Sequence, residues 1–269
     1  MKHSNALAGI CLGVVMALSL SSCTSYKGDL STIVSTKTLV VGTNAEYSPF
    51  EYTNSAGKIM GFDVDFMDLV AKSLGTKYNT TISITWKNMN FDGLIGSLQG
   101  NQIDCIAAAF SITDERAKSV LFSDSYFSAS TVVVTSSTNT TITDMDSLKT
   151  SNCGAQLGTV QAGYIQADGW NTKNKALASI SDLILAIQSN TLDALVVEKP
   201  VAESIIAKQT GLKMIDTIKF DDDGGYGIAS NKDTGTDLIA AINEVIKTNT
   251  DNGVLDQLYI DAANEASGN

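Results

Sequence analysis

The chain has 269 residues, and its 29 Asp and Glu outnumber its 18 Lys and Arg, so its formal net charge is −11. This balance argues against nucleic-acid binding, which needs clustered cations to neutralise phosphates. The only histidine is His3, in a segment that we expect to be removed. We therefore expect neither Ser–His nor Cys–His catalysis, and no metal site built on histidine.

The first 22 residues are typical of a bacterial lipoprotein signal peptide. Lys2 provides a positive charge, residues 6–20 provide an apolar segment, and residues 20–23 (LSSC) resemble a lipobox. In a lipobox the cysteine, here Cys23, becomes the lipidated first residue of the mature chain. The segment is too short for a permanent transmembrane helix, and the alternative is an ordinary signal peptide cut nearby.

Residues 23–36 are small and polar, and we expect them to form a tether between the membrane and the fold. No later stretch is long and apolar enough to span a bilayer. The sequence thus predicts a soluble, extracytoplasmic protein that is anchored to a bacterial membrane through the lipid on Cys23. It would lie in the periplasm or at the cell surface.

Two cysteines remain once the signal segment and the lipidated cysteine are set aside. Cys105 and Cys153 both lie in apolar contexts typical of strands. A bridge between them would join two halves of the chain. Small buried free thiols are the commoner outcome, and we predict that both cysteines are free.

The rest of the chain alternates strands and helices in two units of about a hundred residues each. In the first unit the predicted strands are 39–42, 81–86 and 103–109, and the predicted helices are 62–74, ended by Gly75, and 91–98. In the second unit the predicted strands are 130–135, 153–156, 192–197 and 212–218, and the predicted helices are one opening at 158–161, 181–188 and 200–208. An extended segment at 226–230 precedes closing helices at 238–248 and 254–260. This alternation is typical of α/β proteins with parallel sheets.

Arg116 is the only arginine among the 18 cationic residues. Its planar, two-pronged donor suits a carboxylate in a way that lysine cannot imitate. It follows an apolar strand and lies in the first turn of a predicted helix, where ligands of open α/β sheets bind. Arg116, backbone N–H groups near Ala109 and the Ser111 hydroxyl would together bind a small carboxylate. The alternative is a surface ion pair between Arg116 and Glu115 or Asp124, and the spacing alone does not separate the two.

At this point the chain resembles a known family, the polar amino-acid-binding (family 3) extracytoplasmic solute-binding lipoproteins of ABC importers. The likeness covers residues 39–260. Six segments carry it in the order of the family: VGTNAEYSPFEY (41–52), GFDVDFMDLVAKSLG (61–75), FDGLIGSLQ (91–99), SITDERAKSVLFSDSYF (111–127), LGTVQ (157–161) and LDALVVEKPVA (192–202).

The resemblance implies the α/β, two-lobe fold of periplasmic binding proteins (type II), with two hinge strands and a ligand cleft between the lobes. Its expected boundaries are 37–131 and 226–262 for lobe 1, 132–225 for lobe 2, and 263–269 for a tail. The family members act as monomers without a cofactor. They bind a small molecule and deliver it to an ABC permease by hinge closure.

The resemblance also implies contacts from lobe 1 to an L-amino acid. Arg116 matches the arginine that pairs with the α-carboxylate. The backbone around Ala109 and Phe110, with the hydroxyl of Ser111, matches contacts to the α-amino and carboxylate groups.

Lobe 2 is expected to complete these contacts. The N–H of Val160, at a helix start after Gly158-Thr159, would meet the carboxylate, because a helix N-terminus attracts anions and glycine permits close approach. Glu198 stands where the family usually has Asp, and it would accept the ligand ammonium with one extra methylene in its reach. The local alternatives are a plain strand-to-helix turn at Gly158 and a first-turn helix acid at Glu198.

The ligand side chain is expected to meet two rings and two amides. Tyr47 and Phe91 match the aromatic pair that sandwiches it, although core packing is the alternative for Phe91. Asn44 stands where many binders of basic amino acids carry Asp, and Gln156 is expected to face the cleft. Amides without charge favour a polar, uncharged side chain such as that of glutamine.

Two other functions remain open. The same fold resembles that of periplasmic cyclohexadienyl or arogenate dehydratases, in which Glu198 would act as general acid. A ligand-free surface protein used for adhesion is the second. The lipid tether and the amino-acid-type residues favour binding without catalysis.

Overall fold

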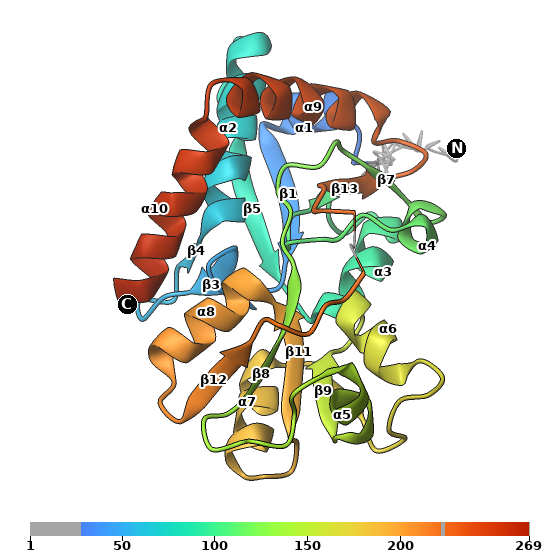
Figure 1. The fold of residues 1–269 in the computed structure, drawn as a ribbon. Helices are drawn as coiled ribbons and strands as arrows, with labels where there is room; N and C mark the ends of the chain where they lie inside the picture. Colours follow the sequence, from blue (N-terminus) through green and yellow to red (C-terminus); the bar gives the residue numbers. More distant parts are fainter. Residues whose placement is uncertain (1–27, 222–223, 269) are drawn as a thin grey trace, which may run out of the picture.

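The computed structural model describes residues 28–221 and 224–268, and these residues form two lobes, one above the other in Figure 1. Each lobe contains one five-stranded sheet with helices packed against it. The predicted α/β, two-lobe architecture is therefore confirmed. The proposed signal segment and Cys23 lie outside the described residues. Within the described ranges, no helix has the length and apolarity needed to cross a bilayer.

Lobe 1 is built from two separate parts of the chain. Its sheet has the order β5 (Ser83–Asn88), β1 (Thr38–Thr43), β6 (Cys105–Ile106), β13 (Ala229–Asn231) and β7 (Val120–Phe122). Strand β1 runs parallel to β5 and β6, whereas β13 runs antiparallel to β6 and β7. A small antiparallel sheet lies beside it, made of β2 (Glu46–Tyr47), β3 (Glu51–Thr53) and β4 (Ile59–Met60).

The helices of lobe 1 cover its sheet and bury apolar side chains. They are α1 (Leu30–Thr36), α2 (Phe62–Lys77), the 3-10 turn η1 (Phe91–Gly93), α3 (Leu94–Gln99), α4 (Asp114–Ala117), α9 (Thr236–Asp251) and α10 (Val254–Gly268). Helix α2 carries two acids in its first turn and a lysine in its last, which suits the helix dipole. Its buried face contacts α9 and α10, and α10 also contacts α8 of lobe 2.

Lobe 2 has the sheet order β10 (Lys175–Leu177), β9 (Cys153–Gln156), β11 (Ala194–Glu198), β8 (Thr131–Ser136) and β12 (Leu212–Ile215). Strands β10, β9 and β11 are parallel, and β8 is antiparallel to both of its neighbours. The apolar run of β8 is buried throughout, because helices cover its sheet. These helices are α5 (Met145–Thr150), α6 (Val160–Gln166), α7 (Ile180–Gln188) and α8 (Lys199–Lys208).

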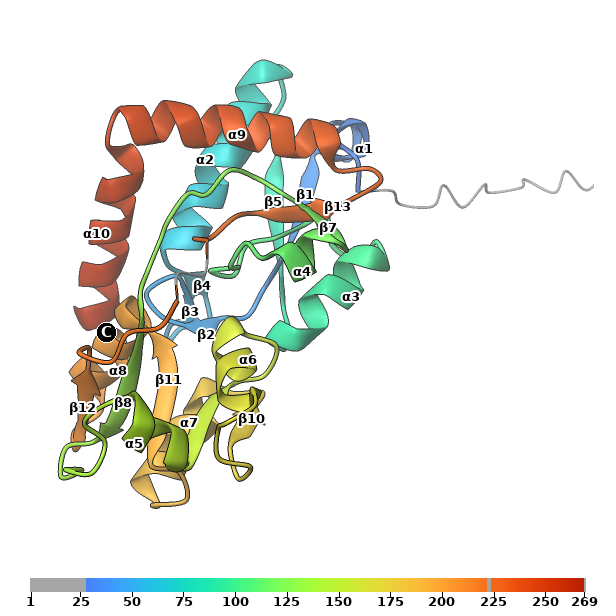
Figure 2. The same cartoon turned by 45° about the vertical axis from the view of Figure 1, so that its right-hand side comes forward.

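Two connecting segments join the lobes, one between β7 and β8 and one between β12 and β13 (Figure 2). They meet at the boundary, where Tyr126 N–H donates to the Tyr226 carbonyl at 2.9 Å and Tyr226 N–H donates to the Phe127 carbonyl at 2.8 Å. The rings of Phe127 and Tyr226 stack with centroids 5.8 Å apart, and Phe50 meets Tyr226 edge-on at 5.2 Å. The two connections are thus paired at Tyr126, Phe127 and Tyr226 and held there by an aromatic cluster.

Three expectations about element ends are wrong. The predicted tether is shorter, since Leu30–Thr36 forms α1, capped by Asp29 and packed into the core through Ile33. Gly75 lies inside α2, because a Cβ there would lie 2.8 Å from the backbone oxygen of Thr80, which folds back on the helix. The predicted tail instead continues α10, where Ala266 is buried.

Candidate functional site

The lone arginine lies at the boundary between the lobes. Thr113 caps α4 by accepting the N–H of Arg116, whose side chain is buried. Its Nη1 donates to the Ser111 carbonyl at 2.7 Å, and its Nη2 donates to the Gly158 carbonyl of lobe 2 at 3.0 Å. Arg116 is therefore buried rather than on the surface, and Glu115, one of the two acids proposed as its partner, pairs with Lys118.

Two aromatic rings flank this guanidinium. Its central carbon lies 4.0 Å from the centroid of the Phe110 ring and 5.3 Å from that of Phe91. A cation over an aromatic face is attracted by the ring quadrupole, and more strongly where water is excluded. The rings hold the plane of Arg116 in place, so its fork is oriented before any ligand arrives.

The Gly158 loop approaches lobe 1 closely. Gly158 has φ +84°, and Thr159 caps α6 by accepting the N–H of Ala162. The predicted helix start at Val160 is therefore confirmed. A Cβ on Gly158 would lie 3.0 Å from both Cα and Cβ of Asp92 in lobe 1. The glycine thus serves two needs, a left-handed backbone and a close approach between lobes.

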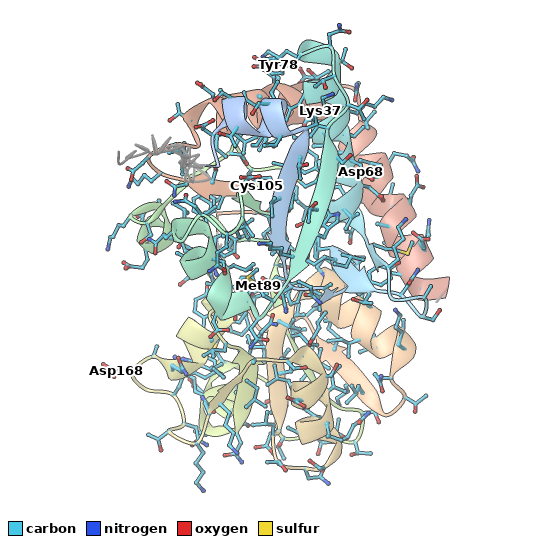
Figure 3. All side chains as sticks on the ribbon, turned by 180° about the vertical axis from the view of Figure 1, so that it is seen from behind. Lys37, Asp68, Tyr78, Met89, Cys105 and Asp168 are labelled. Carbon is cyan, nitrogen blue, oxygen red and sulfur yellow. The ribbon has the colours of Figure 1, made fainter. Side chains whose placement is uncertain are left out.

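The two amides expected to face the ligand bond to each other. Gln156 Nε2 donates to Asn44 Oδ1 at 2.7 Å and to the Ala178 carbonyl at 3.1 Å. Asn44 Nδ2 donates in turn to the carbonyl of Met89, which Figure 3 shows between the two lobes. Both amides are buried. They form a polar contact across the boundary, 112 residues apart in sequence.

A cavity of about 570 Å³ opens beside Arg116 at this boundary. Six of the predicted site residues line it, from both lobes. Its lining is Phe91, Asp92, Ile95, Phe110, Thr113, Glu115, Arg116, Gly158, Thr159, Val160, Gly163 and Tyr164. The structure thus brings an arginine, two aromatic rings and a helix start together around one space.

The other six predicted residues are buried near the boundary: Asn44, Tyr47, Ala109, Ser111, Gln156 and Glu198. Tyr47 stacks on Phe50, and Phe91 packs on Phe110, so both rings expected to sandwich a ligand also belong to the core. Glu198 ends β11 and immediately precedes α8, as the sequence predicts.

Other contacts between the lobes were not anticipated. Ser179 of lobe 2 donates to Glu46 at 2.8 Å, and Ser204 of α8 donates to Ser48 at 2.9 Å. Asp92, opposite Gly158, was also missed. Short polar side chains in loops show no periodicity in the sequence from which a contact could be predicted. These residues find their partners only when the two lobes dock.

The cysteines are free and buried, as predicted. Burial raises the pKa of the Cys153 thiol to about 12, so it stays protonated at neutral pH. Across residues 28–221 and 224–268, no group of three or more His, Cys, Asp and Glu side chains is arranged to hold a metal ion.

Comparison with known proteins identifies the family. Residues 39–261 match bacterial extracellular solute-binding proteins, family 3. A probable histidine-binding protein of Campylobacter jejuni is 33% identical over 83% of this chain and 84% of its own length. The arginine-binding extracellular protein ArtP of Bacillus subtilis is 34% identical over 82% of this chain and 84% of its own length.

A solved structure agrees with these relatives. An ancestral arginine-binding protein bound to glutamine superposes with a TM-score of 0.76 and 32% identity, covering 83% of this chain and 96% of that one. These similar proteins are named for binding, not for catalysis. The present chain is accordingly a binding protein rather than an enzyme, and it belongs to family 3 of the bacterial extracellular solute-binding proteins.

Proposed function

We propose that the protein binds an L-amino acid outside the cytoplasmic membrane and delivers it to an ABC permease. The observation that carries this proposal is the buried Arg116, whose guanidinium spans from lobe 1 to the Gly158 carbonyl of lobe 2. A carboxylate accepts from arginine more strongly than a neutral carbonyl does, because the hydrogen bond joins opposite charges. The names of the relatives support an amino acid as the source of that carboxylate.

Binding would proceed in two stages. Lobe 1 captures the amino acid through Arg116, Ser111 and the backbone at Ala109. Closure then adds Val160 and Glu198 from lobe 2, so the closed state gains contacts that the open state lacks. Only such a difference in affinity shifts the equilibrium between the two states.

The proposed side chain is polar and uncharged, as in glutamine. The Asn44–Gln156 pair offers amides and no charge at the boundary, which suits an amide better than an ammonium. The choice is supported by a similar protein, an ancestral arginine-binding protein that was solved bound to glutamine. Asp in place of Asn44 would instead favour a basic ligand.

The proposed setting is extracytoplasmic. A lipid on Cys23 would attach the protein to the membrane that carries the permease, and the protein would act as a monomer. The match to an extracellular solute-binding family supports this location.

The test is thermal unfolding of residues 24–269 with each of the twenty amino acids. A ligand at a hundred times its Kd adds about 2.7 kcal/mol to the free energy of unfolding, a clearly visible shift in Tm. A shift with one or a few amino acids supports the proposal and names the ligand. No shift in protein stripped of carried-over ligand contradicts it, and turnover of arogenate or prephenate would then favour a dehydratase.

A further inference from the structure

A buried pair of carboxyl groups lies in lobe 1 outside the expected ligand contacts. Glu51 belongs to β3, and Asp63 belongs to the first turn of α2. Both side chains are completely inaccessible to solvent. Two acids that are buried together are costly, so they need a structural reason.

Asp63 accepts hydrogen bonds from two distant parts of the chain. The N–H of Ala109 donates to its Oδ2 at 2.8 Å, and the hydroxyl of Tyr126 lies 2.8 Å from both carboxylate oxygens. Ala109 lies in the loop after β6, and Tyr126 lies in the first segment that connects the lobes. One carboxylate thus ties α2 to the site loop and to the hinge.

A proton on Glu51 would give this buried pair of carboxyl groups a hydrogen bond between them. With both groups ionised, neither Glu51 oxygen would have a hydrogen-bond donor. Burial and the nearby charge of Asp63 raise the pKa of Glu51 well above its ordinary value, so Glu51 keeps its proton and bonds to Asp63. Burial also raises the pKa of Asp63, but the bonds from Ala109, Tyr126 and Glu51 limit that pKa to about 6. At neutral pH, Asp63 is therefore an anion surrounded by donors.

The backbone at Ala109 explains what this anion does. Ala109 has φ +44°, a left-handed conformation that residues with a Cβ rarely adopt. The backbone on either side of Ala109 bonds to other backbone groups of lobe 1. Ala107 N–H donates to the Gly42 carbonyl, and the Phe110 carbonyl accepts from Gly227 N–H. The Ala109 N–H turns to Asp63 instead. Strained backbone of this kind persists only where its surroundings hold it.

We infer that Asp63 is a positioning residue for the bound amino acid: it fixes the Ala109 loop in the shape that the ligand contacts, and it attaches that loop to Tyr126 of the hinge. This inference rests on the proposed function, because the Ala109 backbone is its expected contact to the α-amino and carboxylate groups. Glu51 is the third hydrogen-bond donor to Asp63, after Ala109 and Tyr126. Asp63 is not among the expected ligand contacts and acts through Ala109 and Tyr126.

The test compares Asp63→Ala and Asp63→Asn with Asp68→Asn, a control on the exposed side of α2 (Figure 3). Glutamine, or whichever amino acid stabilises the wild type most, is titrated by calorimetry at a temperature where all variants are folded. We expect Kd to rise at least tenfold in Asp63→Ala. Asp63→Asn keeps an acceptor for Ala109 but loses the charge, so its Kd should rise less than that of Asp63→Ala, and Asp68→Asn should bind as the wild type does.

A pH profile separates positioning from simple destabilisation. Between pH 7 and 5, protonation of Asp63 weakens its hold on Ala109, so the wild-type Kd should rise, whereas in Asp63→Asn it should stay flat. The other titratable groups that face Asp63 are Glu51 and Tyr126, and burial raises the pKa values of both well above their ordinary values. Equal pH dependence in the wild type and in Asp63→Asn would overturn the inference.

Amide hydrogen exchange of ligand-free protein gives a readout that needs no ligand. Exchange in residues 103–112 should accelerate in Asp63→Ala and remain unchanged in Asp68→Asn. Unchanged exchange would overturn the inference even if the wild type binds an amino acid. A wild type that binds no amino acid would instead refute the proposed function. If Asp63→Ala fails to fold, Asp63→Asn carries both the exchange and the pH measurement.

Discussion

Replacement of Gly158 by alanine tests whether ligand binding requires the lobes to meet as they do in this structure. The new Cβ would lie 3.0 Å from two carbon atoms of Asp92 in the opposite lobe. Carbon atoms prefer separations of about 3.5–4.0 Å, so the contact is too close by about half an ångström. Overpacking of this kind costs about 1–3 kcal/mol. The clash exists only when the lobes are closed, and it should lower affinity roughly 5- to 150-fold.

The same substitution also strains the backbone, and this effect must be separated. Gly158 has φ +84°, and a Cβ in this region costs about 1–2 kcal/mol. That strain is present in both the open and the closed state, so it lowers Tm but not affinity. Gly169 provides the matched control, since its φ is +86° and a Cβ there would meet nothing within 4 Å.

Calorimetric titration and thermal unfolding of both variants distinguish the two effects. Gly158→Ala and Gly169→Ala should lose similar stability without ligand, and only Gly158→Ala should lose affinity. Small-angle scattering at the same saturating ligand concentration should also show a larger radius of gyration for Gly158→Ala than for Gly169→Ala. Equal affinity in the two variants would refute the reasoning, because it would mean that binding does not require this approach of the lobes.

Three further predictions concern charged and amide groups. Arg116→Ala should abolish ligand binding while circular dichroism shows an intact fold. Arg116→Lys should also bind poorly, because a single point charge cannot replace the two-pronged guanidinium. Wild-type affinity of either variant in calorimetry would contradict this prediction. Asn44→Asp should move the preference toward arginine and lysine in a thermal-shift screen, and an unchanged ranking of amino acids would speak against a role for Asn44 in selectivity. Glu51→Gln should make the free energy of unfolding depend less on pH. Because the pKa of Glu51 is higher in the folded than in the unfolded protein, the wild type loses stability as pH rises above about 4.5. Glutamine does not titrate, so the variant lacks this loss. Urea unfolding at pH 5 and pH 8 measures the difference, and equal slopes in the two proteins would exclude a protonated Glu51.

The order of the elements was predictable because apolar periodicity records which face of each segment is buried. Helix α2 and strand β11 follow that pattern directly. Helix α1 was missed because its seven residues are mostly polar, and Ile33 is buried only through packing against the rest of lobe 1. Gly75 was misread because glycine ends many helices, whereas here it admits a neighbouring chain.

The candidate site also divides into residues that local sequence predicts and residues that only the docked lobes reveal. Arg116 was identifiable because a single arginine among many lysines is unusual, and its placement in a capped helical turn is local information. The bond between Asn44 and Gln156 depends on how two lobes dock, which no local pattern encodes. The Glu51–Asp63 pair was not identified from the sequence, because the partners of Asp63, Ala109 and Tyr126, come from distant parts of the chain.

If the protein is lipidated at Cys23 as proposed, the start of helix α1 limits the distance between lobe 1 and the membrane. Its cap, Asp29, accepts the N–H of Thr32 at 2.7 Å within the helix, and the buried Ile33 holds the helix on the core of lobe 1. For a chain lipidated at Cys23, five residues separate the anchor from this cap, and the six steps between them, at about 3.3–3.6 Å each, reach at most roughly 20 Å. Lobe 1 would remain beside the bilayer while lobe 2 moves, and the permease would meet its donor at a high local concentration.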